Sequence, residues 1–260
     1  MKKKLVLIAC ISLIVSGINA QNDSPVKFAF AIQPATSWIA PEGQILENES
    51  SRIGFSYGVI IDLVIAGNEN YNFSTGVLIN SHGGTLNNPK YHDGTTTVPN
   101  PDGPDPILYP AFAFAKEEYR LQYLDVPLTL KLKTNEIGYM TYYGQFGLDM
   151  SFNIKARRDV EYNFPEEGIM TIEDEDVLDE IGLLRMALQV GAGVDYNISG
   201  NTSLLVGIVW NNGLTNTFDK NYLLEDANGN PEFSDNNRLR EGGKVRAVSN
   251  YLGLTAGIFF

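Results

Sequence analysis

The sequence predicts an all-β chain: an eight-stranded antiparallel transmembrane β-barrel with four long extracellular loops. Three observations predict it. The residues Tyr251 to Phe260 alternate, with an apolar side chain at every second position. Seven further segments alternate in the same way. The connections between the segments are short and polar or long, and the two kinds alternate along the chain. No segment after residue 20 approaches the roughly 18 consecutive apolar residues of a spanning helix, so only a closed barrel would cross a bilayer.

The first twenty residues are expected to be a secretory signal peptide, and residues 21–260 the outer-membrane barrel domain. Lysines at positions 2–4 precede an apolar run from Leu5 to Val15, and small and polar residues end at Ala20. The alternative is a lipoprotein signal ending at Cys10, but the apolar run before this cysteine is short. Cys10 is the only cysteine. Once the signal is removed, the chain contains no cysteine and can form neither a disulfide nor a thiol-dependent site.

Alternation places the strands in order along the chain, separated by two kinds of connection. Short connections at 66–70, 133–138 and 199–201 are expected to face the periplasm, and long ones at 35–52, 82–119, 156–182 and 215–246 the outside. Both termini would then be periplasmic, in the outer membrane of a Gram-negative cell. The expected strands lie near 26–34, 53–65, 71–81, 120–132, 139–155, 183–198, 202–214 and 247–260.

The side chains at the odd and at the even positions of each expected strand differ in size as well as in polarity. In 139–155 the even positions are mostly large and apolar, while the odd positions are polar, aromatic or glycine up to Lys155. A narrow barrel interior favours small side chains, so the large apolar parity is predicted to face lipid. The glycines that share the polar parity are Gly147, Gly191, Gly193, Gly207, Gly253 and Gly257.

Charged residues on the inward parity are expected to pair inside the barrel, because an unpaired charge in a narrow lumen is very costly. The sequence predicts a central network in which Arg185 and Lys131 lie among four aspartates. We expect this network to be structural, and the alternative is a proton or ion path. The inward charges are Lys27, Asp62, Asp125, Lys131, Asp149, Arg185 and Asp195.

The segment Gln122–Lys133, QYLDVPLTLKLK, resembles the "Y-L-(E/D)-(I/V)-P-L-L-L-K" strand of the PorT-like outer-membrane barrels of Bacteroidetes-type bacteria. The glycines at 144 and 147 and the final residues Gly257–Phe260 also fit this family. The resemblance implies an eight-stranded barrel, and a role in protein secretion for one branch. It also implies that Tyr251, Gly257 and Phe260 belong to a signal read by the barrel-assembly machinery. Because proline donates no hydrogen bond, we expect a bulge or a local break at Pro127, with its ring inward.

The long connection 156–182 is rich in carboxylates, which hard cations such as calcium prefer. Its weak candidates for metal ligands are Glu173, Asp174, Asp176 and Asp179, and the alternative is a solvated acidic loop. Arg157 and Arg158 at its base are candidates for binding lipopolysaccharide phosphates.

The chemistry of the chain favours neither an enzyme nor a nucleic-acid partner. The only histidines, His82 and His92, fall in a predicted loop beside no G-x-S-x-G element, so no catalytic residue or cofactor is expected. The net charge of −12 argues against nucleic acid. We therefore expect a structural or interaction protein acting through extracellular loops. Its expected partners are outer-membrane lipid, lipopolysaccharide and the assembly machinery. The alternatives are an accessory of a secretion system, with secretion proteins as partners, and a small-solute channel.

Overall fold

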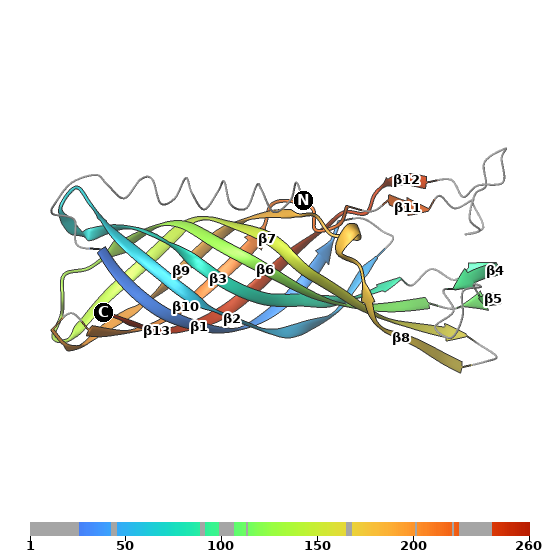
Figure 1. Ribbon diagram of the computed structural model, residues 1–260, viewed down its shortest axis with the longest axis horizontal. Coiled ribbons are helices and arrows are strands. Elements are labelled where there is room, and N and C mark those ends of the chain that lie inside the picture. The colour runs from blue at the N-terminus through green and yellow to red at the C-terminus, as the bar shows by residue number, and fades with distance from the viewer. Residues whose placement is uncertain are drawn as a thin grey trace.

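The computed structural model describes residues 26–42, 46–88, 92–98, 107–112, 114–164, 168–200, 202–219, 221–223 and 241–260. Eight long strands form a closed antiparallel ring in the order β6-β3-β2-β1-β13-β10-β9-β7, and β7 pairs back with β6 (Figure 1). This confirms the predicted eight-stranded barrel. The ring strands are β1 (Val26–Pro41), β2 (Glu47–Ile65), β3 (Asn68–Asn88), β6 (Phe114–Lys133), β7 (Met140–Phe164), β9 (Leu184–Ser199), β10 (Thr202–Gly213) and β13 (Ala247–Phe259).

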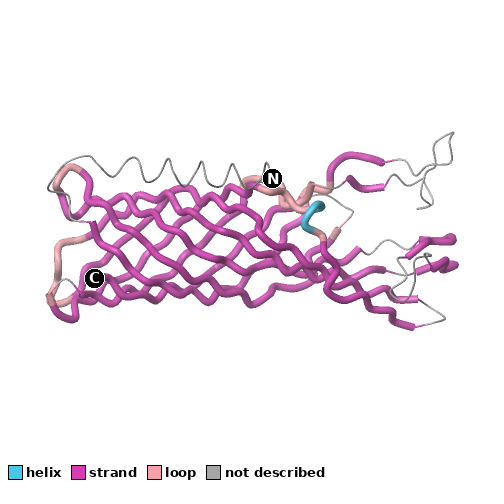
Figure 2. The backbone as a smooth tube through the Cα atoms, viewed as in Figure 1, coloured by secondary structure: helices cyan, strands magenta, loops and turns pink. Residues whose placement is uncertain are grey.

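The two ends of the barrel differ. One end, here called the short-turn end, carries the tight connections and the C-terminus (Figure 1). Its β2–β3 turn consists of Ala66 and Gly67, both at positive φ (52° and 70°), as a two-residue hairpin turn requires. At the other end, the long-loop end, strands run on beyond the barrel, as the magenta tube in Figure 2 shows. The further elements are β4 (His92–Val98), β5 (Ile107–Phe112), β8 (Gly168–Asp176), the 3-10 helix η1 (Leu178–Glu180), β11 (Asn221–Leu223) and β12 (Glu241–Lys244).

The outer wall of the barrel is an apolar belt. Along β13, Leu252, Leu254 and Ile258 are exposed, while Gly253 and Thr255 between them are buried. The other ring strands repeat this alternation, which confirms that the large apolar parity faces outward. Among the described residues, no helix has the length and apolar character needed to cross a membrane. Exposed members of the belt on other strands include Phe28, Phe30, Ile32, Tyr57, Phe146, Leu148, Val190, Val206 and Ile208.

A bulge in β7 marks the limit of this belt on the side of the long-loop end. Gln122 pairs with Lys155 and Tyr123 with Asn153, so Ile154 is an extra residue in β7. One extra residue exchanges the two faces of the strand. Lys155, expected to point inward, is therefore exposed, and Ala156 is buried instead. Beyond the bulge the outward residues of β6 and β7 are charged. We call this part of β3, β6 and β7, together with β8 and η1, the extension.

The ladder between β3 and β6 is interrupted opposite Pro127. Pairing stops at Ser74 and Thr129 and resumes at Leu78 and Asp125 without a change of register. On the other side, Pro127 opposes Asp149 in an unbroken ladder with β7. The missing N–H of proline accounts for the gap. The expected local break is thus confirmed, with no bulge at Pro127 itself and with its buried ring lining the lumen.

The segment 156–182, expected to be a long loop, is largely strand. β7 continues to Phe164, and β8 returns beside it from Gly168 to Asp176. The prediction was wrong here because, beyond the belt, charged residues stand on both faces of β7, with Arg158 inward and Arg157 outward. Hydropathy then no longer alternates, although the backbone ladder continues. The same reason explains why β1, β2, β3 and β6 extend past their expected limits at this end.

Candidate functional site

One group of buried charges lies in the lumen toward the short-turn end. Asp62 Oδ2 lies 2.9 Å from Lys131 Nζ and 3.1 Å from Lys133 Nζ, and its Oδ1 accepts a 2.6 Å hydrogen bond from Ser74. Lys133 also lies 3.1 Å from Asp195 Oδ2. The side chains of Asp62 and Lys131 are 0% and 1% exposed, so these ion pairs are shielded from water. Two lysines and two aspartates balance each other in this group.

A second group of charges surrounds Arg185, closer to the long-loop end of the lumen. We call it the upper group, and the group around Asp62 the lower group. Arg185 Nη1 lies 3.8 Å from Asp149 Oδ2, and its guanidinium also donates to Ser151 Oγ, to Asn211 Oδ1 and to a backbone carbonyl. Asn211 in turn donates to Asp149 at 2.9 Å. Asp125 accepts a 2.7 Å hydrogen bond from Asn80 Nδ2 and takes part in no ion pair among the described residues. Polar side chains therefore anchor this group on several strands.

The six residues expected in one network thus fall into two groups. Asp62, Lys131 and Asp195 lie in the lower group, and Asp125, Asp149 and Arg185 lie in the upper one. Lys133 belongs to the lower group, although sequence reasoning placed it in the turn after residue 132. Lys133 stands at an odd position of β6, as Asp125 and Lys131 do, and this spacing could have predicted that it points inward. Lys27, also expected inward, is partly exposed and lines the mouth at the short-turn end.

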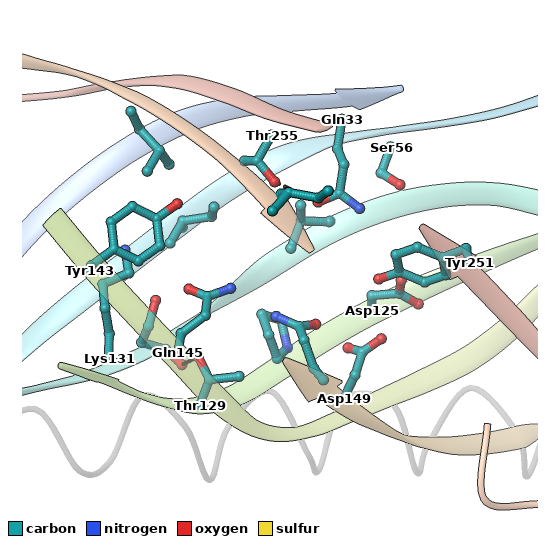
Figure 3. A pocket seen from close by; sticks show the side chains of 17 residues that line it. Gln33, Ser56, Asp125, Thr129, Lys131, Tyr143, Gln145, Asp149, Tyr251 and Thr255 are labelled. Carbon is teal, nitrogen blue, oxygen red and sulfur yellow. Dashed lines mark hydrogen bonds between the residues drawn. The ribbon is translucent and has the colours of Figure 1, made fainter. Parts of the chain in front are cut away.

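A small cavity of about 40 Å³ separates the two groups. Figure 3 shows Asp125, Asp149 and Tyr251 at one end of it and Lys131 and Tyr143 at the other. Because one water needs roughly 10–15 Å³ by this kind of measure, the cavity has room for a few water molecules only. The lumen is thus filled by side chains at this level.

An apolar cluster closes the lumen at the long-loop end. Its members come from barrel strands, from the flanks of η1 and from the segment after β10, and all are at most 4% exposed. The rings of Tyr119 and Phe218 meet edge to face with centroids 5.1 Å apart. The cluster consists of Ile39, Leu86, Tyr119, Leu121, Tyr123, Ala156, Val177, Ile181, Phe218 and Ala247.

Arg158 ties this cluster to the extension. Its guanidinium lies 2.7 Å from Glu175, 3.2 Å from Glu180 and 3.7 Å from Glu117. Tyr119 donates a short hydrogen bond to Glu117. Burial, together with the neighbouring charge of Glu117, raises the pKa of the Tyr119 hydroxyl well above its ordinary value, so this tyrosine stays a neutral donor. One arginine thus holds β6, β8 and η1 together.

The candidate metal ligands on β8 and beyond do not converge. Asp174 lies 3.2 Å from Arg120, and Asp176 lies 3.6 Å from Arg157. Glu173 and Asp179 are exposed to solvent. Among the described residues, no three acidic, histidine or cysteine side chains are grouped to hold a metal ion.

The two histidines differ from their expected loop setting. His82 lies within β3, is 1% exposed, and stacks on Tyr123 with ring centroids 4.7 Å apart. In the described part of the chain, neither of its ring nitrogens has a hydrogen-bond partner. His92 begins β4, and its side chain lies outside the described residues. A fully buried imidazole on a barrel strand is a core side chain rather than an accessible base.

The short-turn end opens into a polar vestibule of about 630 Å³. Asn70 Nδ2 donates a 2.9 Å hydrogen bond to Asn135 Oδ1, which links the start of β3 to the β6–β7 connection at the mouth. Lys133, Asp195 and Phe259 contribute to its lining. As far as the described residues show, the lumen is therefore wide at the short-turn end and filled by the apolar cluster at the long-loop end.

The residues expected to form an assembly signal lie on or beside β13. Tyr251 and Gly257 point into the barrel, while Phe260 is 55% exposed on the outside. The Phe260 ring lies 5.7 Å from that of Phe30, and its N–H donates to the Phe28 carbonyl at 3.0 Å. Recognition by the assembly machinery stays a prediction.

Comparison with known proteins adds a family to this geometry. A family model described as "Outer membrane protein beta-barrel domain" matches residues 17–219. No curated protein matches the chain. One similar solved structure is Neisserial surface protein A, at 11% identity and a TM-score of 0.41, covering 92% of this chain and 98% of that one. Another is the outer membrane protease OmpT from Escherichia coli, also at 11% and 0.41, covering 93% and 99%. Ail from Yersinia pestis has 11% identity and a TM-score of 0.34, covering 90% and 98%.

Proposed function

The chain belongs to the outer membrane protein beta-barrel domain family, and we propose that it is an interaction protein that binds partners through its long-loop end. This proposal puts the short-turn end, with both termini, in the periplasm and the extension outside the cell. Outer-membrane barrels generally have short periplasmic turns and longer extracellular loops, which supports this orientation.

The extension is the observation that carries the proposal. It continues the barrel wall as a folded sheet that packs on the apolar cluster at the end of the lumen and is held there by the Arg158 network. A barrel does not need strands beyond the belt in order to be anchored in a membrane. A rigid, solvent-exposed sheet outside the belt supports binding, because an ordered surface loses little conformational entropy when a partner attaches.

Site-specific photo-cross-linking in cells tests this role. With a photoreactive amino acid at Glu173, on the extension, we expect protein adducts that disappear when protease is added to intact cells. The same substitution at Glu136, in the short β6–β7 connection, is the matched control because both residues are exposed acids. Absence of adducts at Glu173 under conditions in which Glu136 forms them would contradict an extracellular interaction role.

A second candidate role is that of an accessory in protein secretion, and the vestibule is the observation that favours it. A cavity of about 630 Å³ at the short-turn end offers a periplasmic partner a polar recess. In this case the cross-links would form from Glu136 and would resist external protease. Deletion of the gene would then leave secreted proteins in the periplasm, whereas the first role predicts no such accumulation.

Purified protein in planar lipid bilayers is expected to show no steady open-channel current. Within the described residues, the apolar cluster fills one end of the lumen, and the cavity between the two groups of charges holds about 40 Å³. A hydrated ion finds no continuous path in such a lumen. Sustained conductance steps in single-channel recordings, absent from protein-free bilayers, would favour the small-solute channel instead.

Lipopolysaccharide remains a proposed partner at the rim of the belt. Arg157 and Arg158, the expected phosphate ligands, each lie near carboxylates of the extension, so a phosphate would have to compete with Asp176 and Glu175. Lys155 is exposed just above the belt and takes part in no ion pair within the described residues. It is the better placed of these cations for a lipid phosphate.

A further inference from the structure

The vestibule at the short-turn end is a blind recess. Its volume of about 630 Å³ falls in the range of roughly 300–1,000 Å³ that is usual for ligand pockets. Lys133 and Asp195 line its inner part, and the buried pair of Asp62 and Lys131 fills the lumen beyond them. A polypeptide therefore finds no way through the described part of the lumen. The end of a chain fits such a recess, whereas the middle of a chain would have to fold back on itself.

The inner part of the vestibule contains one lysine that the protein leaves without a counter-ion. Lys133 lies 3.1 Å from both Asp62 and Asp195, so its charge is compensated. Lys27 lines the vestibule, is partly exposed, and takes part in no ion pair among the described residues. Its cross-strand neighbour is Asp62, which Lys131 and Lys133 already share. The inner part therefore presents a positive charge to a ligand.

The mouth of the vestibule carries the opposite charge. Glu69 follows the β2–β3 turn, and Glu136 lies in the β6–β7 connection. Both are exposed, line the vestibule, and take part in no ion pair in the described part of the chain. Lys27 pairs with Asp62, three residues before β2 ends at Ile65. At about 3.3 Å per residue, Lys27 thus lies roughly 10 Å along the strand from the turn. The charge changes from negative at the mouth to positive inside.

Most of the remaining lining is neutral and polar. It includes the amide groups of Asn72 and Asn197 and the hydroxyl groups of Thr141 and Ser203. Amide and hydroxyl groups both donate and accept hydrogen bonds. A peptide backbone needs both kinds of partner when it leaves water. The lining therefore suits an extended peptide better than an apolar ligand.

We propose that the vestibule binds the C-terminal end of another polypeptide, with the terminal carboxylate on Lys27 and a lysine or arginine beside Glu69 or Glu136. Three residues of extended chain span the roughly 10 Å between the two levels, so the basic residue stands about three positions before the last one. An amino terminus would bring its own positive charge against Lys27. A wholly anionic ligand would be repelled by the acids at the mouth. Capture of a terminal carboxylate is a recurring mode of peptide recognition.

A peptide-binding experiment on the full chain, refolded in detergent micelles, tests this inference. The probe is a glycine–serine hexapeptide with a free carboxylate, lysine at the fourth position from its C-terminus, and a fluorophore at its N-terminus. Fluorescence anisotropy reports binding. We expect the same peptide with a C-terminal amide to bind about tenfold more weakly, because it lacks the charge that Lys27 attracts. Equal binding of the acid and the amide peptides would overturn the inference.

Two variants locate the carboxylate. Lys27→Gln is expected to weaken the acid peptide about three- to tenfold at low salt and to leave the amide peptide unchanged. Lys155→Gln is the matched control, because it removes the same charge from an exposed lysine near the long-loop end, and we expect it to change neither peptide. A folding defect in Lys27→Gln would weaken both peptides alike. Such an equal loss, or equal effects of the two variants, would contradict a carboxylate site at Lys27.

The mouth is tested by the double variant Glu69→Gln with Glu136→Gln. In the unchanged barrel we expect the lysine peptide to bind about two- to fivefold more tightly than the peptide with serine in place of lysine. The double variant should abolish this preference and keep the preference for the acid over the amide. A preference for lysine that persists in the double variant would overturn the assigned direction of the peptide.

This inference rests on the second candidate role, for which it names the end of the partner that enters the vestibule, but the two fail separately. Cross-links from Glu136 in cells, together with equal binding of acid and amide peptides, would overturn the inference and leave the secretion role standing. Selective binding of the acid peptide that is lost in Lys27→Gln, without cross-links from Glu136, would support the site and contradict the secretion role.

Discussion

Asp62→Asn is expected to lower the free energy of unfolding by about 3–5 kcal/mol, the range for breaking a buried ion pair by removing one partner. Asp62 is the carboxylate that Lys131 and Lys133 share. Lys133 keeps Asp195, but Lys131 is left with the rings of Tyr143 and Phe259, 4.6 and 5.1 Å from its ammonium. Aromatic rings compensate a buried ammonium only partly. Urea titration of the barrel refolded in lipid vesicles, followed by tryptophan fluorescence, measures the loss.

The matched control is Glu118→Gln, which removes an acid from an exposed pair with Arg52 at 3.7 Å. Its expected effect is at most about 1 kcal/mol, as for surface ion pairs in general. The double variant Asp62→Asn with Lys131→Met removes both buried charges, and we expect it to recover much of the loss. If Asp62→Asn proved no more destabilising than Glu118→Gln, the lower charge group would not stabilise the barrel.

The belt strands could be predicted because lipid and lumen impose opposite demands on neighbouring residues. Gly253 and Leu254 illustrate this, since one is buried in the lumen and the other is 62% exposed on the belt. Each spanning segment carries such a signal, so both the number of strands and their facing follow from the sequence. Pro127 was predictable for a local reason, because its missing donor must interrupt one ladder.

The extension could not be predicted from alternation, because its physical setting removes the signal. The bulge at Ile154 exchanges the faces of β7, and no residue type there announces it. Beyond it, Arg158 is inward and Arg157 outward, yet both are arginines that bind carboxylates. The contacts of Arg158 with Glu175 and Glu180 depend on how the chain returns after the hairpin, which the sequence pattern does not contain. Likewise, Phe218 joins the apolar cluster from a segment without periodicity.

Gly193→Ala is expected to destabilise the barrel by about 1–3 kcal/mol or to impair refolding, because the lumen has no space for a methyl group. A Cβ at this position would collide with the Val206 carbonyl oxygen and lie 2.6 Å from Tyr143 Cζ. The carbonyl belongs to the neighbouring strand β10, so it moves only if the ladder itself moves. The loss is measured by the same urea titration and by the yield of heat-modifiable, folded protein on gels.

Gly144→Ala is the control for this substitution, since nothing lies within 4 Å of a Cβ there. It changes the same residue type on an adjacent strand but on the outer wall, and we expect its effect to stay within about 0.5 kcal/mol. A comparable loss at Gly144 would show that the conformational preference of glycine, rather than crowding in the lumen, decides the outcome.

Gly207→Ala separates crowding by a side chain from crowding by the backbone. Its Cβ would collide with the hydroxyl of the same Tyr143, whereas the nearest backbone atom, the Ala192 carbonyl oxygen, lies 3.0 Å away. Tyr143→Phe removes that hydroxyl, so we expect it to rescue Gly207→Ala to a large extent. It should leave most of the Gly193→Ala loss in place, because the Val206 carbonyl remains. Equal rescue at both sites would mean that the tyrosine hydroxyl, and not the approach of β10 to β9, limits the space in this lumen.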